Sequence, residues 1–264
     1  MENIGKDNKN FYETFDWEKA NLKFKLQKKI QILHKYIPQD VISIVDIGAG
    51  DGTITKTLQK KYKTVAVDRS KNALKFIDGN KVMASADYLP FKVKEFDLVF
   101  SSEMLEHLPD EIFIKTIEQI KYTAKKYIYL TFPNNETIEK NFIKCPVCQE
   151  VFNKSYHLRN LNIHKIQDLL ENDFKLIHSF ELDKPIRDYN KFLLKIKHKF
   201  SSSDSWMPEN RTKSTGRDVM CPKCNHFFEL TYRFSLISTL CDLINIIISK
   251  KRPYQLCVLF ERNK

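Results

Sequence analysis

Short runs of consecutive apolar residues alternate along the chain with stretches in which apolar residues recur every three or four positions. The run VISIVDI (41–47) is continuous and β-branched, which is typical of a strand buried on both faces of a parallel sheet. Similar runs are KTVAVD (63–68), KVMASA (81–86), FDLVFSS (96–102) and YIYLTFP (127–133). Helical periodicity fills the segments before and between them, at 22–37, 53–61, 71–77 and 110–124. This alternation predicts an α/β fold with a doubly wound, Rossmann-like sheet.

The regular alternation ends after the fifth predicted strand. A helix at 162–171 leads to a sixth strand, FKLIHSFEL (174–182), and YQLCVLFER (254–262) reads as a seventh. Between these two strands lies a long insertion that includes SSSDSWMPENRTKSTGRD and the apolar helix FSLISTLCDLINIIIS. We therefore divide the chain into a helical cap (1–40), a core (41–182), an insertion (183–253) and a final core strand (254–264).

Composition and charge narrow the class of protein. With 264 residues, 42% of them hydrophobic, the chain is long enough for a substantial core. The polar start MENIGKDNKN has no secretory pattern, so the expected location is cytoplasmic. The 16-residue apolar helix (234–249) contains Asp242 and is shorter than the roughly 20 residues of a membrane span. It is predicted to be a buried or lid helix, and peripheral membrane contact stays open.

The net charge of +11 favours polyanionic partners. Its lysines are spread over the whole chain, however, and no basic run is interleaved with aromatic residues. A nucleic-acid partner is therefore compatible with the sequence but not favoured by it.

The segment VDIGAGDGT (45–53) leads from a strand directly into three glycines, which permit a tight turn and close approach of backbone amides to a ligand. This pattern alone is shared by folds that bind NAD, FAD or S-adenosylmethionine. Asp46 would repel a pyrophosphate and suits an amine-bearing ligand. Asp68 ends the second strand, where an acid can bind both ribose hydroxyls, and Asp87 follows the third, within reach of an adenine amine.

These segments resemble the class I S-adenosylmethionine-dependent methyltransferases, in particular the methyltransferase type 11 and ubiquinone-pathway O-methyltransferase groups. VDIGAGDG, VDRS, SADYLPF, FDLVFSSEMLEHL and YIYLTFPN match the successive motifs over residues 40–182. The resemblance implies in-line transfer of a methyl group from S-adenosylmethionine. It assigns Asp46, Gly48, Ala49 and Gly50 to the methionine end, Asp68 and Arg69 to the ribose, Ala86, Asp87 and Tyr88 to the adenine, and Ser102 and Glu103 to the sulfonium.

The stretch EMLEH (103–107) follows the fourth predicted strand. If a helical turn begins at Glu103, then Glu103, Glu106 and His107 share one face. His157, in the loop after strand five, opens at the same sheet edge and would complete a carboxylate–imidazole set suited to Mg²⁺, Mn²⁺ or Zn²⁺.

This cluster resembles the Glu-x-x-Glu-His motif and distant histidine of two methyltransferase groups, the small-RNA 3′-terminal 2′-O-methyltransferases and the ubiquinone-pathway enzymes. There the motif holds a divalent ion that binds the acceptor hydroxyls, and such an ion would lower the hydroxyl pKa. The predicted catalytic residues are Glu106, His107 and His157. The alternatives are a histidine acting as a metal-free base or substrate contact, and a structural role.

Four of the six cysteines form two similar knuckles, CPVCQEVF and CPKCNHFF. Cys145, Cys148, Cys221 and Cys224 can supply four thiolates to one structural zinc ion, because the loops after strands five and six leave the same sheet edge. Gln149 and Asn225 stand where such knuckles usually have glycine. The predicted zinc would connect the first knuckle (143–152) to the second over the active site. The alternatives are a zinc ribbon that contacts RNA and four unliganded thiols.

The predicted function is O-methylation of a small molecule or of a surface-polysaccharide sugar, with the hydroxyl activated by a histidine or a divalent metal. The loop around Trp206 and the helix after Cys224 are predicted to form a pocket for a glycan or a lipid-linked sugar. The alternatives are RNA ribose 2′-O-methylation and a non-catalytic, zinc-containing binding module. The cofactors expected are S-adenosylmethionine, structural zinc and, in the metal-dependent alternative, magnesium or manganese.

Overall fold

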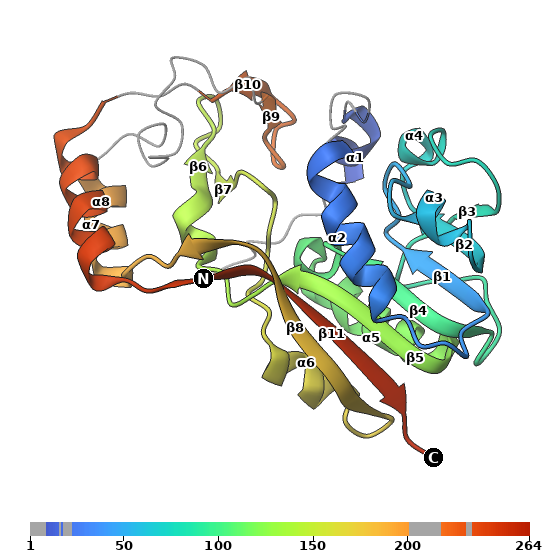
Figure 1. Cartoon of the computed structure of the whole chain (residues 1–264). Coiled ribbons are helices and arrows are strands. Elements are labelled where there is room, and N and C mark those ends of the chain that lie inside the picture. Colours follow the sequence, from blue (N-terminus) through green and yellow to red (C-terminus); the bar gives the residue numbers. More distant parts are fainter. Residues whose placement is uncertain (1–8, 16, 18–22, 201–217, 231–233) are drawn as a thin grey trace.

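The computed structural model describes residues 9–15, 17, 23–200, 218–230 and 234–264. Within these residues the strands form one seven-stranded sheet of order β3-β2-β1-β4-β5-β11-β8 and two two-stranded hairpins (Figure 1). The large sheet contains β1 (Ser43–Ile47), β2 (Lys63–Asp68), β3 (Lys81–Met83), β4 (Phe96–Ser102), β5 (Ala124–Pro133), β8 (Phe174–Arg187) and β11 (Lys251–Arg262). β1 to β5 pair in parallel, whereas β11 is antiparallel to both of its neighbours. The predicted Rossmann-like sheet is confirmed.

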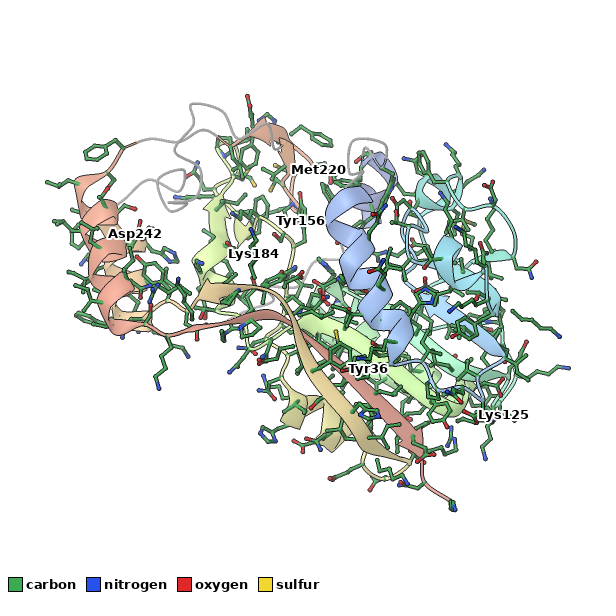
Figure 2. The ribbon with its side chains drawn as sticks, in the orientation of Figure 1. Tyr36, Lys125, Tyr156, Lys184, Met220 and Asp242 are labelled. Carbon is green, nitrogen blue, oxygen red and sulfur yellow. The ribbon has the colours of Figure 1, made fainter. Side chains whose placement is uncertain are left out.

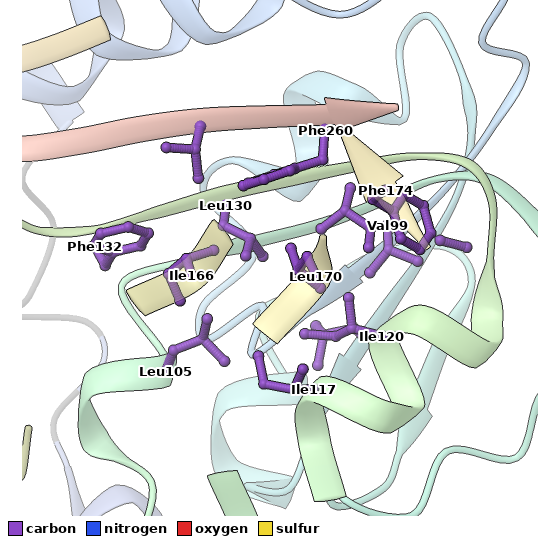
Figure 3. Close-up of a cluster of buried hydrophobic side chains, with 14 of the residues drawn as sticks. Val99, Leu105, Ile117, Ile120, Leu130, Phe132, Ile166, Leu170, Phe174 and Phe260 are labelled. Atoms are coloured by element: carbon purple, nitrogen blue, oxygen red, sulfur yellow. The ribbon is translucent and has the colours of Figure 1, made fainter. Parts of the chain in front are cut away.

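Helices cover both faces of this sheet (Figure 1). They are α2 (Lys23–Lys35), α3 (Thr55–Leu58), α4 (Lys71–Leu74), α5 (Asp110–Thr123) and α6 (Ile163–Leu170). On one face, α5 and α6 pack their apolar stripes against β4 and β5, so that Val99, Leu130 and Ile166 are fully buried (Figure 3). On the other face, Leu33 of α2 and Leu58 of α3 pack against Leu98 and Tyr129. The core lies between these layers.

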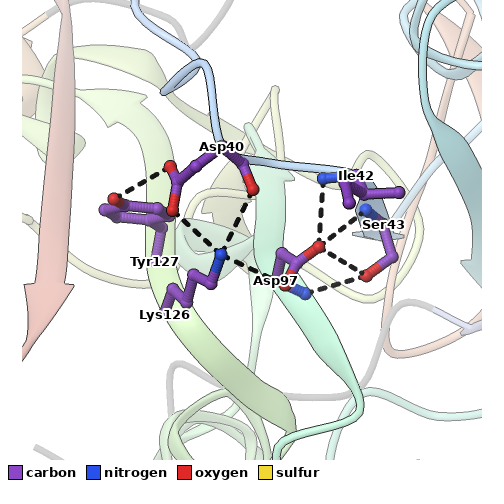
Figure 4. Close-up of polar contacts among 6 residues, drawn as sticks. All are labelled: Asp40, Ile42, Ser43, Asp97, Lys126 and Tyr127. Atoms are coloured by element: carbon purple, nitrogen blue, oxygen red, sulfur yellow. Dashed lines mark hydrogen bonds and ion pairs between the residues drawn. The ribbon is translucent and has the colours of Figure 1, made fainter.

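The amino-terminal ends of three strands are joined by polar contacts (Figure 4). Asp97 at the start of β4 accepts hydrogen bonds from the backbone amides of Ile42, at 3.0 Å, and Ser43, at 3.1 Å. Lys126 of β5 forms an ion pair with Asp40 at 2.9 Å and approaches Asp97 at 3.8 Å. These contacts fix the edge of the sheet opposite the one where the functional groups gather.

Some predicted elements differ in extent. The expected helix at 53–61 is the single turn α3, and the expected strand at 81–86 ends at Met83. The turn predicted after strand four is the 3₁₀ turn η1 (Leu105–His107). Further elements have no predicted counterpart: α1 (Lys9–Thr14), α7 (Lys191–Phe200), the hairpins β6–β7 (Phe142–Lys144 and Val151–Asn153) and β9–β10 (Asp218–Met220 and Phe227–Glu229), and the 3₁₀ turn η2 (Ile138–Asn141). The apolar helix is α8 (Leu236–Ile248).

Candidate active site

The carboxyl ends of β1, β2 and β4 border a cleft of about 390 Å³. Its floor is the glycine turn after β1, where the amides of Gly48 and Ala49 donate to the carbonyl of Val67 at 2.8 and 3.0 Å. Gly48 has φ = 76°, and a Cβ there would lie 2.5 Å from Cγ of Met104. The turn therefore requires glycine both for its backbone conformation and for the close approach of Met104.

Asp68 lies beside this turn and lines the cleft. Its carboxylate accepts hydrogen bonds from the amides of Gly50, at 2.9 Å, and Ser70, at 2.8 Å. Burial raises the pKa of this carboxyl group, and the backbone hydrogen bonds oppose that rise. Asp68 thus connects the glycine turn to the end of β2 and leaves lone pairs for a bound hydroxyl.

Asp46 lies under the turn and is 2% exposed. Its Oδ2 accepts a hydrogen bond of 2.6 Å from Oγ1 of Thr55. Burial, and secondarily the charge of Asp68, raises the pKa of Asp46 to about 7. Asp46 is not among the residues that line the cleft, so its contact with a cofactor stays a prediction.

Eight residues assigned to the cofactor line the cleft: Gly48, Ala49, Gly50, Asp68, Arg69, Ala86, Ser102 and Glu103. Asp87 and Tyr88 do not. Asp87 accepts a hydrogen bond from the hydroxyl of Ser85, and Tyr88 is 81% exposed.

Three aromatic residues near the start of the described chain were not predicted to line the cleft. Tyr12, Phe15 and Trp17 lie over it from α1 and the residues that follow. The ring of Tyr12 lies 5.8 Å from the guanidinium of Arg69, and its backbone carbonyl accepts from the hydroxyl of Ser70 at 3.1 Å. We call Tyr12, Phe15 and Trp17 the aromatic cover. Their signal in the sequence is the aromatic cluster FYETFDW (11–17), which stands out in an otherwise polar segment.

Glu103 has a left-handed backbone, with φ = 54°, and a helical turn does not begin there. The turn after β4 is instead η1, which starts at Leu105. The amide of Glu103 donates to the carbonyl of Thr131 at 2.9 Å, and its carboxylate accepts from Nε2 of Gln255. A non-glycine residue held in this conformation is a feature that clusters at functional sites.

Glu106, His107 and His157 come together at the rim of the cleft. One ligand atom from each lies within 4.8 Å of the others. The two imidazole rings are 4.8 Å apart and almost perpendicular, and Nε2 of His107 lies 3.8 Å from Oε1 of Glu106. Glu103 is not part of this group, because its carboxylate is bound to Gln255 from β11.

The Nδ1 atoms of both histidines are hydrogen-bonded to residues that the sequence analysis did not identify. Nδ1 of His107 is 3.0 Å from the hydroxyl of Tyr12, and Nδ1 of His157 is bonded to Oε2 of Glu136. These contacts fix the orientation of both rings. A carboxylate on the outer nitrogen of a histidine is the usual support of a metal-binding imidazole.

Glu106 provides a test of whether a divalent ion fits. It is 1% exposed, and neither carboxylate oxygen has a hydrogen-bond partner within the described residues. Burial, and then the charge of Glu103, holds the pKa of Glu106 well above its usual range. Burial and the neighbouring His157 lower the pKa of His107 to about 3, which leaves that imidazole neutral. A buried carboxyl group without a hydrogen-bond partner beside two imidazoles is a donor set that fits a divalent cation.

The four knuckle cysteines converge at a separate place. Sγ of Cys145 lies 3.7 Å from that of Cys224, Sγ of Cys148 lies 3.5 Å from that of Cys221, and all four sulfurs are within 4.8 Å of one another. Four thiolates around zinc at about 2.3 Å would be separated by roughly 3.8 Å. The chain therefore brings together a four-cysteine cluster with the spacing of a structural metal site, as predicted, and the identity of the metal stays a prediction.

The cysteine cluster is joined to the cover of the cleft. The hydroxyl of Tyr156 donates to the carbonyl of Met220 at 3.1 Å and accepts from its amide at 2.9 Å (Figure 2). The ring of Tyr156 also packs 4.2 Å from that of Phe11 in α1. Since Tyr156 precedes His157, the cluster, α1 and the histidine pair form one connected unit.

A second cleft, of about 290 Å³, reaches Glu136, the residue hydrogen-bonded to His157. Glu136, which holds His157, lines it, as does Tyr254, whose pKa is raised by burial and by the carboxylates of Glu103 and Glu136. The charged residues of its lining are four cations and two carboxylates: Lys140, Lys154, Arg187, Arg252, Glu136 and Asp188. This cleft thus has a cationic lining next to the candidate catalytic residues.

Residues 45–121 match the model of the methyltransferase domain family. Over 154 residues the chain is 28% identical to an uncharacterised protein of Methanocaldococcus jannaschii. The matched region covers 56% of this chain and 61% of that protein. Over 96 residues it is 36% identical to the human mitochondrial arginine-hydroxylase NDUFAF5. That matched region covers 34% of this chain and 27% of the human protein. The chain therefore spans less than two thirds of the length of these curated relatives.

Many solved structures have a similar fold, and two of them illustrate it. One is an S-adenosylmethionine-dependent methyltransferase from Archaeoglobus fulgidus, with a TM-score of 0.52, 17% identity, and coverage of 94% of this chain and 100% of that chain. The other is a chain of the complex that contains the Haloferax volcanii Trm112 methyltransferase activator, with a TM-score of 0.57, 12% identity, and coverage of 99% of this chain and 100% of that chain.

Proposed function

Because the chain carries a class I S-adenosylmethionine-dependent methyltransferase domain, we propose that it transfers the methyl group of that cofactor to a hydroxyl of a small molecule or of a surface-polysaccharide sugar. The observation that carries the proposal is that His107 lines the cofactor cleft and at the same time belongs to the Glu106–His107–His157 cluster. An acceptor hydroxyl at this cluster would lie beside the cofactor. Placement and proton removal are what methyl transfer requires of the protein.

Cofactor binding is assigned to the glycine turn and Asp68, with Tyr12 and Trp17 covering the bound molecule. The carboxylate of Asp68 has the right chemistry to accept hydrogen bonds from two ribose hydroxyls. Gly50 faces Trp17 closely, since a Cβ on Gly50 would lie 3.1 Å from the indole. The cover therefore closes on the glycine turn itself.

For the acceptor, we assign Glu106, His107 and His157 as the residues that would hold a divalent ion. Such an ion would lower the pKa of a bound hydroxyl. Glu136 and Tyr12 keep the two imidazoles oriented whether or not an ion is present. In the metal-free alternative, one of these imidazoles would accept the acceptor proton directly.

The second cleft is the assigned entry for the acceptor. Its hydroxyl and amide groups, from Thr137, Asn141 and Tyr254, suit a sugar, and its cations suit a sugar that carries phosphate or carboxylate. The pocket predicted around Trp206 lies outside the described residues.

Calorimetric titration with S-adenosylmethionine and S-adenosylhomocysteine tests the cofactor assignment. Asp68→Asn should weaken binding by roughly ten- to a hundredfold, because the amide has one acceptor oxygen and no charge where the carboxylate has two charged acceptor oxygens. Lys63→Gln, a change of an exposed residue at the start of the same strand, serves as the control. If the unchanged protein binds neither compound, the proposed function fails.

Metal dependence is tested separately. Protein from which a chelator has removed the divalent ion should bind Mn²⁺ in a titration. Glu106→Gln should abolish that binding without changing the affinity for S-adenosylhomocysteine. If protein treated with a chelator too weak to remove the zinc keeps full activity without added metal, the metal-free base is the correct mechanism.

RNA ribose 2′-O-methylation is the second candidate, and the net charge of +11 supports it. Co-purification with RNA that is lost steeply as salt rises would favour it.

The name of the human relative adds hydroxylation as an alternative, which the mass of the product distinguishes from methylation. A protein partner is a further proposal, supported by the similarity to a chain of the Trm112 complex. The non-catalytic module would bind cofactor without turnover.

A further inference from the structure

Helix α8 turns its polar residues inward and its apolar residues outward. Ser238, Cys241 and Asn245 are its buried positions. Its outward face is made of large apolar side chains that are each 38–83% exposed: Leu236, Ile237, Leu240, Leu243, Ile244, Ile246, Ile247 and Ile248. Surface helices in water show the reverse arrangement. The outward face of α8 is therefore suited to a non-aqueous neighbour.

Polar contacts fix α8 in this orientation. Asp242, labelled in Figure 2, accepts hydrogen bonds of 2.6 Å from Nζ of Lys197 and from the hydroxyl of Tyr189. Asn245 accepts from the amide of Asn190 and donates to the carbonyl of Asp188, both at 2.9 Å. Lys197 in α7 is fully buried. Rotating α8 to hide its apolar face would leave this buried lysine without its partner, at a large cost in free energy.

Cations border the apolar face. Helix α7, which packs beside α8 at one end of the molecule (Figure 1), has exposed lysines at positions 191, 195 and 199. Lys250 and Lys251 are exposed immediately after α8. Phe192 and Phe200 of α7 are also exposed, by 70% and 56%.

We propose that α7 and α8 attach the protein to the surface of an anionic lipid membrane, with α8 lying flat in the interface. Exposed apolar residues would enter the acyl boundary while the bordering lysines meet the lipid phosphates. Within the described residues, no helix is long and apolar enough to cross a membrane. The 13 residues of α8 span about 20 Å, against a hydrocarbon core of about 30 Å, so a flat position is the one its length permits.

Charge complementarity selects lipid over a second copy of this chain. A copy would bring its own lysines against these lysines, and the chain as a whole has a charge of +11. An anionic lipid surface satisfies both the apolar face and its cationic border. The proposal is independent of methyl transfer, since none of these residues lines the cofactor cleft.

Vesicle co-sedimentation tests the proposal. The protein should bind vesicles of phosphatidylcholine mixed with phosphatidylglycerol, bind pure phosphatidylcholine vesicles much more weakly, and be released progressively by salt. Leu243→Glu combined with Ile247→Glu should weaken binding roughly tenfold or more, because both carboxylates would enter the interface. The matched control is Ile114→Glu on α5, a residue 51% exposed on another surface, which should leave binding unchanged. Lys195→Gln with Lys199→Gln should weaken binding to the anionic vesicles in particular.

Circular dichroism and titration with S-adenosylhomocysteine verify that each variant is folded. Failure of the unchanged protein to bind anionic vesicles would overturn the proposal. If light scattering then detects dimers that dissociate in the Leu243→Glu/Ile247→Glu variant, the face joins two copies of the chain instead. Equal binding of the Ile114→Glu and Leu243→Glu/Ile247→Glu variants to vesicles would also overturn it.

Discussion

The buried carboxyl group of Asp46 is expected to make the stability of the folded protein depend on pH. Asp46 has one side-chain hydrogen bond, from Thr55, and is 2% exposed beneath the glycines. Because burial disfavours its charged form, its pKa in the folded protein, about 7, exceeds the usual value of 3.8. The folded state therefore holds this proton more tightly than the unfolded state does.

The sign of the effect on stability follows directly. The contribution of Asp46 is fully present below its unfolded pKa and is lost as the pH rises through about 7. Asp46→Asn should remove this part of the pH dependence, which amounts to at most about 4 kcal/mol. Urea unfolding of the cofactor-free protein at about pH 5 and pH 8 measures it. Parallel changes in the two proteins would contradict the assignment.

The two cysteine knuckles have the same turn conformation, but a different residue follows the second cysteine in each, at the position where φ is positive. Gln149 and Asn225 both have left-handed backbones, with φ = 62° and 58°, where the amide of each donates to the carbonyl of the first cysteine, at 3.1 and 2.9 Å. Asparagine tolerates this conformation better than glutamine does. The first knuckle is therefore the more strained of two otherwise similar turns.

Replacing the strained residue should stabilise the protein. Gln149→Gly should raise the free energy of unfolding by roughly 0.5–1 kcal/mol, because glycine adopts positive φ without steric cost. Asn225→Gly is the matched control and should give a smaller gain. Thermal unfolding of the three proteins in parallel provides the comparison, and a larger gain in the second knuckle would show that strain is not the cause.

The strands could be predicted from sequence because runs such as FDLVFSS are buried on both faces and bounded by turns. The glycine turn and Asp68 could be placed because they follow such strands. The contacts of Tyr12, Glu136 and Gln255 could not, since they join segments far apart in the chain through packing alone. The periodicity of α8 likewise predicted a helix but not which face is buried, because Asp242 is inward only by virtue of Lys197 and Tyr189.

At the scale of the whole molecule, the cysteine cluster supports the cover of the cleft. The contacts run from Cys221 through the neighbouring Met220 to Tyr156, and from Tyr156 to Phe11 of α1. Helix α1 in turn places Tyr12 against His107. A metal at the cysteines would therefore influence cofactor binding without touching the cofactor.

Removal of the bound metal tests this coupling. Elemental analysis should find about one zinc per chain, and a strong chelator should lower both the melting temperature and the affinity for S-adenosylhomocysteine. Cys221→Ser should reproduce both effects, and added zinc should reverse them only in the unchanged protein. A protein that purifies without zinc, or whose affinity is insensitive to the chelator, would exclude the coupling.

The position of β11 has a consequence for how the protein is made. This strand lies between β5 and β8, yet begins more than a hundred residues after β5 ends. Until the ribosome has released residues 251–262, the apolar edge of β5 has no neighbour, and pairing across so long a loop is slow. Newly synthesised chains should therefore need protection from aggregation at this edge. Since Gln255 of β11 holds Glu103, the candidate active site should also be among the last parts of the molecule to form.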